Sequence, residues 1–306
     1  MLKDYLRLHF IVFLWGFTAI LGKLISLPPV ELVFYRTLIA SVGLAILLVS
    51  RKQEWRVSRG QALRLLGVGA MVAVHWITFF LAARLSSVSV CLAGMATLAL
   101  WTSILEPLIL RKRFEAYEIV LGLVAMVGLY LVSQAEFDQL LGLGVAVFSA
   151  GLSALFSVFN AKLTKQHPPL RLTFYEMSGA CLSIALFLIV RPGFGGELPQ
   201  LAPTLLDWLW LLILAGVCTV YAFSASVELQ QRLSAFSLNL TVNLEPVYGI
   251  ALAVLIFGSQ EKMSTGFYLG TVIILLSVLV HPVIDQWVRR RRAASQLPIP
   301  HEEVAG

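Results

Sequence analysis

Long apolar segments recur along almost the whole chain, and several carry no charged residue over a span's length. Three examples are Leu85–Leu105, Leu140–Ala161 and Met263–Ile284. A helix needs about 20 apolar residues to cross the hydrocarbon core of a bilayer. Hydrophobic residues make up 58% of the chain and charged residues 13%, against roughly 25% charged residues in an average soluble protein. A soluble core has too little volume to hide this much apolar surface. We therefore predict an all-α integral membrane protein without room for a soluble domain.

Ten such segments can be recognised, and together they leave only short loops. The predicted spans are 7–27, 30–50, 62–84, 86–110, 117–135, 139–162, 170–190, 206–227, 233–258 and 264–285. The first span follows Lys3 and Arg7 and resembles a signal peptide, but it lacks an Ala-x-Ala-like cleavage site, so we expect it to be retained.

The basic residues fall mainly on one side of the predicted membrane. With ten spans, 18 of the 23 Lys and Arg residues share the side of both termini. The others are Lys23, Arg36, Arg84, Arg191 and Lys262. The positive-inside rule places that side, with both termini, in the cytoplasm of a multi-pass protein of the cell (plasma or inner) membrane. The basic tail, residues 286–306, contains the run Arg289–Arg292, which is expected to contact anionic lipid rather than nucleic acid.

Two stretches of the chain match each other in order and spacing. Residues 23–35 and 162–175 share a Lys-Leu pair, a Pro-Pro pair and a Phe-Tyr pair, at offsets of 139 and then 140 residues. These matches predict a first repeat at 1–136 and a second at 137–285. Each repeat holds five spans, and an odd number forces the two repeats into opposite membrane orientations. Inverted repeats of this kind recur in secondary transporters, where they expose one central site to each side in turn.

The motifs at both ends of this arrangement resemble those of the EamA-type repeat. The opening motifs are Trp15-Gly16, Gly22-Lys23, Leu27-Pro28-Pro29 and Tyr35-Arg36. The closing motifs are Ser234-Ala235-Phe236-Ser237, Glu245-Pro246-Val247, Phe257-Gly258 and Glu261. The resemblance covers residues 10 to 285 and implies the drug/metabolite transporter (DMT) superfamily. It implies ten transmembrane helices as two inverted five-helix repeats around a central cavity, and export (efflux) of amino acids, other metabolites or drugs.

Glu245 is the first candidate for the central site. It lies near the middle of the span 233–258, where a charged carboxylate costs roughly 2.5–3.5 kcal/mol. Glu245 is therefore expected to face the protein interior or water, or to be protonated, which suits proton coupling. Thr241 and Tyr248 share its helical face by their spacing. The alternative is a static carboxylate that holds two helices together.

Asn239 and Asn243 form an i, i+4 pair on nearly the opposite face of that regular helix. Two opposite faces do not easily line one cavity, so one set is expected to bind the solute and the other to join helices through hydrogen bonds. The pattern leaves open which face lines the cavity.

Several further residues have both a functional and a structural interpretation. His75 lies deep in the span 62–84 and suits either proton relay or neutral packing. Lys23 and Arg36 lie near the outer ends of their spans. They could attract an anionic group of the solute or close an outer gate. The structural alternative is that their side chains reach to the membrane interface. Trp15, Trp101 and Tyr221 lie near mid-depth, away from the usual interfacial belts, so they suit a cavity wall or tight packing.

Secondary transport of a small-molecule substrate by alternating access is the leading hypothesis. The chain has no G-x-x-x-x-G-K-[ST] loop, which argues against ATP as the direct energy source and favours proton coupling or exchange. An intramembrane enzyme acting on a lipid or small molecule is the alternative, but neither H-E-x-x-H nor G-x-S-x-G occurs.

We expect no enzyme activity, catalytic residue, metal or cofactor. The expected partners are the substrate and membrane lipids, with no nucleic acid; a homo-oligomer is compatible with the sequence but not required.

Overall fold

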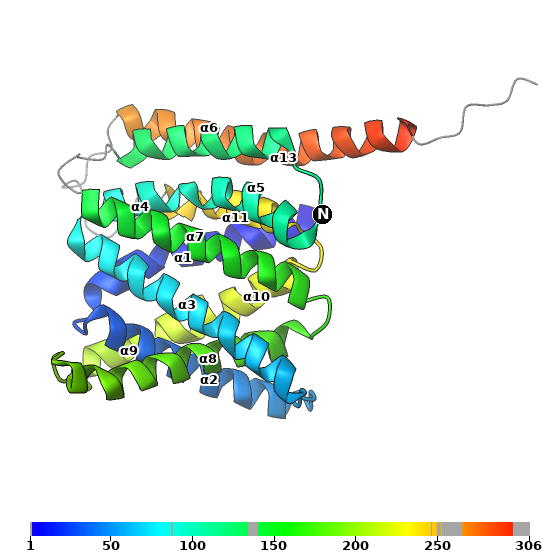
Figure 1. Ribbon diagram of the computed structural model, residues 1–306. Coiled ribbons are helices and arrows are strands. Elements are labelled where there is room, and N and C mark those ends of the chain that lie inside the picture. The colour runs from blue at the N-terminus through cyan, green and yellow to red at the C-terminus, as the bar shows by residue number, and fades with distance from the viewer. Residues whose placement is uncertain are drawn as a thin grey trace, which may run out of the picture.

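A computed structural model describes residues 2–86, 88–133, 140–245, 247–249, 252 and 265–295. The described residues form helices joined by short loops (Figure 1). In chain order the α-helices are α1 (Leu2–Leu24), α2 (Pro29–Ser50), α3 (Arg59–Leu85), α4 (Val88–Met95), α5 (Thr97–Leu110), α6 (Ala116–Ser133), α7 (Leu140–Leu163), α8 (Pro169–Val190), α9 (Leu205–Ala215), α10 (Ala222–Leu229), α11 (Ala235–Val242) and α13 (Thr265–Ser295). A 3-10 turn, η2 (Arg191–Phe194), follows α8, and a π-helical segment, η3 (Gly216–Tyr221), joins α9 to α10.

Eight helical segments of the described chain are long and apolar enough to cross a membrane. α4 and α5 together form one of them, Val90–Leu110, and α9, η3 and α10 form another, Leu205–Leu229. The apolar helix at Ala116–Leu131, within α6, is shorter. The chain is thus a multi-pass membrane protein. The predicted span 233–258 is described only in part, as α11 and a few residues beyond it, so ten spans remain a prediction.

Helices far apart in sequence pack side by side. α3 packs against α7 and α8, α2 packs against α8 and α9, and α6 packs against α13. Figure 1 shows α6 with α13 along one edge of the molecule and α2 with α8 and α9 along the opposite edge. The remaining helices lie between these edges, where α5, α7 and α11 pack against one another and α10 packs against α1 and α8.

Close packing between α3 and α8 depends on two glycines. A Cβ added to Gly69 on α3 would collide with the backbone carbonyl of Glu176, and one added to Gly179 on α8 would collide with the backbone of Leu66. Small residues let helix backbones approach in this way. On α7, Ala146, Ala150 and Ala154 form a stripe of small residues at helical spacing. All three are fully buried, so α7 also packs closely against its neighbours.

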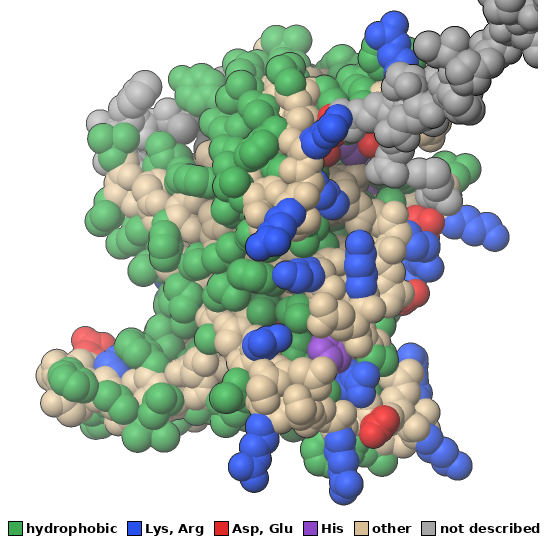
Figure 2. Space-filling model, turned by 45° about the vertical axis from the view of Figure 1, so that its right-hand side comes forward, with side chains coloured by type: hydrophobic (Ala, Val, Ile, Leu, Met, Phe, Trp, Pro, Cys, Tyr) green, Lys and Arg blue, Asp and Glu red, His purple; other side chains and the backbone are tan. Residues whose placement is uncertain are grey.

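The outer flank of the bundle is apolar, whereas one end is basic. On α2, Val42, Ile46 and Val49 are exposed at helical spacing, and α13 exposes a similar row from Leu269 to Val283. Figure 2 shows Lys and Arg side chains gathered over one end, beside an apolar flank. The exposed basic residues of this end are Arg51, Lys52, Arg56, Arg59, Arg64, Arg111, Lys112, Arg113, Lys162, Lys165 and Arg232. An apolar flank with a charged end matches the surface of a helical bundle in a bilayer.

Candidate functional site

A cavity of about 90 Å³ lies inside the bundle, lined by residues of α1, α2, α3, α4, α5, α7, α10 and α11, with Glu245 just beyond α11. Its walls combine aromatic and aliphatic side chains with polar side chains. The aromatic residues are Trp15, Trp76, Phe79, Phe156 and Phe223. The charged lining residues are Arg36 and Glu245. The cavity therefore combines one cation and one carboxylate with apolar and uncharged polar side chains.

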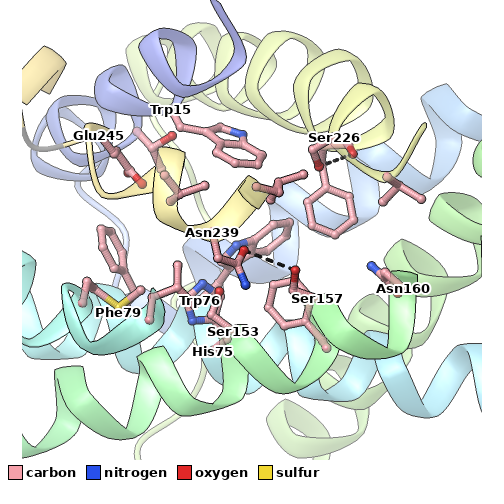
Figure 3. Close-up of a pocket in the computed structure, with 18 of the residues that line it drawn as sticks. Trp15, His75, Trp76, Phe79, Ser153, Ser157, Asn160, Ser226, Asn239 and Glu245 are labelled. Atoms are coloured by element: carbon pink, nitrogen blue, oxygen red, sulfur yellow. Dashed lines mark hydrogen bonds between the residues drawn. The ribbon is translucent and has the colours of Figure 1, made fainter. Parts of the chain in front are cut away.

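Asn239 and Glu245 both line this cavity (Figure 3). The expectation that opposite faces of a regular helix would separate them is wrong, because the helix is not regular. The N–H groups of Asn243 and Leu244 donate to carbonyls three residues earlier, at Leu240 (3.3 Å) and Thr241 (3.0 Å). Such i→i+3 bonds turn the chain by about 120° per residue instead of 100°. The tightening brings Glu245 round toward the side of Asn239.

Arg36 is held in the wall by two neighbours. The side chain is only 2% exposed, and its guanidinium carbon lies 3.7 Å from the centre of the Trp76 ring. Its Nε donates a 2.8 Å hydrogen bond to Thr219 Oγ1. Thr219 belongs to η3, and its hydroxyl donates in turn to the Leu214 carbonyl at 3.0 Å. The π-helical segment thus presents an oxygen to the arginine, in keeping with the frequent occurrence of such segments at functional sites.

His75 joins α3 to α7 at the cavity wall. Its Nδ1 lies 2.9 Å from the Ser149 carbonyl oxygen, which can only accept a hydrogen bond. Ser149 Oγ donates to the His75 carbonyl at 2.8 Å. We therefore assign the proton to Nδ1, which leaves Nε2 as an acceptor. Ser149 is fully buried and does not line the cavity, so this Ser–His contact joins two helices and exposes no nucleophile to the cavity.

A chain of hydrogen bonds crosses from α10 to α5 along the cavity. Gln230 Nε2 donates to Ser157 Oγ at 2.8 Å, and Ser157 Oγ donates to Asn239 Oδ1 at 3.2 Å, the contact drawn in Figure 3. Asn239 Nδ2 then donates to Thr102 Oγ1 at 2.8 Å. Four helices are thereby joined through neutral polar groups, which suits a wall that must stay ordered without adding charge.

Trp15 completes the wall from α1. Its indole Nε1 donates a 3.0 Å hydrogen bond to the backbone carbonyl of Cys218, in η3. Among the residues proposed from the sequence, the structure therefore brings Trp15, Arg36, His75, Asn239 and Glu245 to one cavity. The side chain of Lys23 lies outside the described residues.

The other proposed residues lie elsewhere. Trp101 and Tyr221 are 38% and 44% exposed, and Tyr221 packs edge-on against Phe10. Of the two interpretations given above, a place in the cavity wall does not fit them, because neither residue lines the cavity. Thr241 donates to the Ser237 carbonyl at 2.9 Å within its own helix. Tyr248 lies 3.0 Å from His9 Nδ1, and Asn243 is buried outside the cavity.

Sequence reasoning missed several lining residues. Ser153, Ser157 and Asn160 lie on one side of α7 and line the cavity. Gln230, at the end of α10, and Trp76, next to His75, also line the cavity. The sequence feature that indicates the α7 residues is a row of polar side chains at helical spacing along a charge-free span. Such groups need hydrogen-bonding partners inside the bundle.

The acidic residues near the basic end form structural contacts. Glu106 accepts hydrogen bonds from Lys112 Nζ at 2.7 Å and from the Phe236 N–H, in the first turn of α11, at 2.8 Å. Glu228 pairs with Arg7 at 3.0 Å and more loosely with Arg232 at 3.8 Å. Both carboxylates join helix ends at a distance from the cavity.

Comparison with known proteins agrees with this architecture. A curated relative, an uncharacterized transporter from Archaeoglobus fulgidus, is 24% identical over 192 residues, which cover 61% of this chain and 68% of the relative. A solved crystal structure superposes with a TM-score of 0.75 at 15% identity, over 94% of this chain and 98% of the other, which shows the shared fold. The model of the EamA-like transporter family matches twice, at residues 5–134 and 140–281. The chain therefore belongs to the EamA-like transporter family.

Proposed function

We propose that this membrane transporter is a secondary transporter that exports a small metabolite (an amino acid, a related compound or a drug) by alternating access. The observation that carries the proposal is the internal cavity that holds Arg36 and Glu245. Charged side chains inside a bilayer are costly, and they persist where they serve a solute or ion pathway. A cavity of about 90 Å³ has room for several water molecules or a small solute.

The two family matches support two repeats of five spans in opposite orientations, at 1–136 and 137–285. Residues from both proposed repeats line the cavity: Arg36 and His75 come from the first, and Ser157, Asn239 and Glu245 from the second. A site shared between two inverted halves can be exposed to either side when the halves exchange conformations.

The basic end of the bundle is assigned to the cytoplasm, with both termini. The cavity lining extends toward this end, to Asn160 in the last turn of α7 and Gln230 just after α10. At the other end, Asp207 accepts hydrogen bonds from the Ser26 N–H at 2.8 Å and the Ser26 hydroxyl at 2.7 Å. These contacts tie the end of α1 to the start of α9. They support an inward-facing conformer in the cell membrane, with its outer end closed.

Glu245 is the proposed coupling group. In an exporter driven by protons, this carboxyl would take up a proton in one conformation and release it in the other. In an exchanger, Glu245 would instead bind a cationic group of the solute. Both roles require the group to face the cavity, as Glu245 does.

Transport is tested with purified protein in sealed vesicles loaded with a panel of metabolites. Saturable efflux of at least one solute, absent from protein-free vesicles, is the expected result. If correctly folded protein releases none of the panel faster than empty vesicles do, the transport proposal is wrong.

A further inference from the structure

Arg36 is a buried cation whose hydrogen-bonding capacity is mostly unused. A guanidinium group has five N–H donors. The Nε–H donates to Thr219 Oγ1, and the face of the group lies on the Trp76 ring. Among the described residues, no oxygen accepts a hydrogen bond from the two terminal NH₂ groups of Arg36. The group is therefore held in a fixed plane while most of its donors lack an acceptor.

The carboxylate of the same cavity does not supply the missing acceptor. Glu245 lines the cavity and interacts electrostatically with Arg36. The two side chains nevertheless form no hydrogen bond or ion pair in the described part of the chain. A buried charge without an ion-pair partner is strongly unfavourable. An oxyanion that enters the cavity would satisfy the arginine at the position where the protein leaves it unpaired.

We infer that Arg36 is the subsite for a carboxylate group of the transported solute, an inference that rests on the proposed transport function. The planar fork of a guanidinium matches the two oxygens of a carboxylate. Trp76 and Thr219 fix the plane of this fork before the solute arrives, which lowers the entropic cost of binding. Arg36 therefore determines which solutes the cavity selects.

The charges of the cavity favour a carboxylate over a phosphate. Arg36 is the one cationic side chain among the described residues that line the cavity, and Glu245 adds a negative charge. A phosphate monoester carries close to two negative charges at neutral pH. Arg36 would neutralise only half of this charge, and Glu245 would repel the phosphate. A carboxylate carries a single negative charge, which Arg36 neutralises, and it is repelled less by Glu245 than a phosphate is. The aromatic rings of Trp15, Phe79 and Phe223 can cover the apolar part of such a solute.

Equilibrium binding to the purified full-length protein in nanodiscs, measured by calorimetry, tests the subsite. The probes are acids paired with their amides of equal size: benzoate with benzamide, isovalerate with isovaleramide, and L-leucine with L-leucinamide. Phenyl phosphate is the phosphate probe. We expect at least one acid to bind about tenfold or more tightly than its amide, as charge-assisted hydrogen bonds require. Arg36→Gln is expected to remove this preference and leave amide binding within about twofold.

Further variants separate recognition from folding. Arg36→Lys keeps the charge but loses the fork, so it is expected to retain only part of the preference for the acid. Thr219→Val removes the acceptor of the Nε–H, together with the hydroxyl's own bond to the Leu214 carbonyl, and is expected to weaken acid binding without changing amide binding. It takes the place of Arg36→Gln if that variant fails to fold. Arg64→Gln, at an exposed position of α3, is the matched control and is expected to bind like the wild type.

Four outcomes would overturn the subsite. They are equal binding of acid and amide by the wild type, equal weakening of both by Arg36→Gln, binding of phenyl phosphate alone, and no binding of any acid to folded wild-type protein. Flux measurements separate the subsite from transport itself. Saturable flux of acids that Arg36→Gln leaves unchanged would refute the subsite and retain transport. Arg36-dependent acid binding without flux of any solute would retain the subsite and refute transport.

Discussion

Asn239 and Glu245 face one cavity because the chain tightens between them, where the N–H groups of Asn243 and Leu244 donate to carbonyls three residues earlier. Asn243 does not line the cavity, although it lies only four residues after Asn239. The segment from Asn239 to Glu245 therefore contributes a hydrogen-bonding amide and a carboxylate to the same cavity.

The two asparagines make a matched pair for mutation. Asn239 is hydrogen-bonded on both sides, to Ser157 and Thr102, whereas the buried Asn243 Nδ2 has no partner among the described residues. Asn239→Leu removes two buried hydrogen bonds and is expected to lower the free energy of unfolding by about 1–3 kcal/mol. Asn243→Leu removes an unsatisfied group and is expected to be neutral or stabilising. Thermal unfolding in detergent measures both, and equal losses would contradict the assigned contacts.

Gly69 and Gly67 test the contact between α3 and α8. A Cβ at Gly69 would collide with the Glu176 carbonyl, whereas one at Gly67 meets nothing within 4 Å. Gly69→Ala is therefore expected to destabilise the protein by about 1–3 kcal/mol. Gly67→Ala is expected to stabilise α3 by up to about 1 kcal/mol. The ranking of the two melting temperatures is the measurement, and a stable Gly69→Ala variant would show that the helices do not approach so closely.

Glu106 is expected to matter more than the lysine that pairs with it. Its side chain is 5% exposed and accepts from both Lys112 and the first turn of α11, whereas Lys112 is half exposed. Glu106→Leu leaves the Phe236 N–H without an acceptor, at an expected cost of about 1–3 kcal/mol. Lys112→Met is expected to cost about 0–1 kcal/mol, as exposed ion pairs do. Unfolding curves for the two single variants show which substitution lowers the free energy of unfolding more. A larger loss for Lys112→Met than for Glu106→Leu would show that the ion pair is the main interaction.

The proposed orientation is tested by labelling introduced cysteines in intact cells. In a background with Cys91, Cys181 and Cys218 replaced by alanine, Phe194→Cys and Gln166→Cys place one thiol at each exposed end of α8. A membrane-impermeant maleimide is expected to label Phe194→Cys in intact cells and Gln166→Cys only after permeabilisation. The opposite pattern would place the basic end outside the cell.

Hydropathy predicted the helices well because a bilayer demands long apolar segments. The predicted spans 30–50, 139–162 and 170–190 coincide closely with α2, α7 and α8. Depth and charge also selected Arg36 and Glu245, because charged residues in such segments must face inward.

Hydropathy did not distinguish residues that line the cavity from residues that face lipid, since apolar and aromatic side chains occur on both surfaces at mid-depth. Trp15 lines the cavity, whereas Trp101, at a similar depth, lies on the outer flank. The tightening at Asn243 and Leu244 was also outside the reach of a regular helical pattern, because it depends on the local hydrogen bonding of two residues.

Solute efflux from vesicles as a function of pH, for the wild type and for Glu245→Gln, tests the central claim most directly. Glutamine keeps the size of the side chain but has no titratable proton. We predict saturable wild-type efflux that depends on pH, and a slower efflux with a flat pH profile for Glu245→Gln. An Asn243→Leu control, changed outside the cavity, is expected to keep the wild-type profile. An unchanged pH profile in folded Glu245→Gln would contradict proton coupling at Glu245, and no efflux by the folded wild type would contradict transport through this cavity.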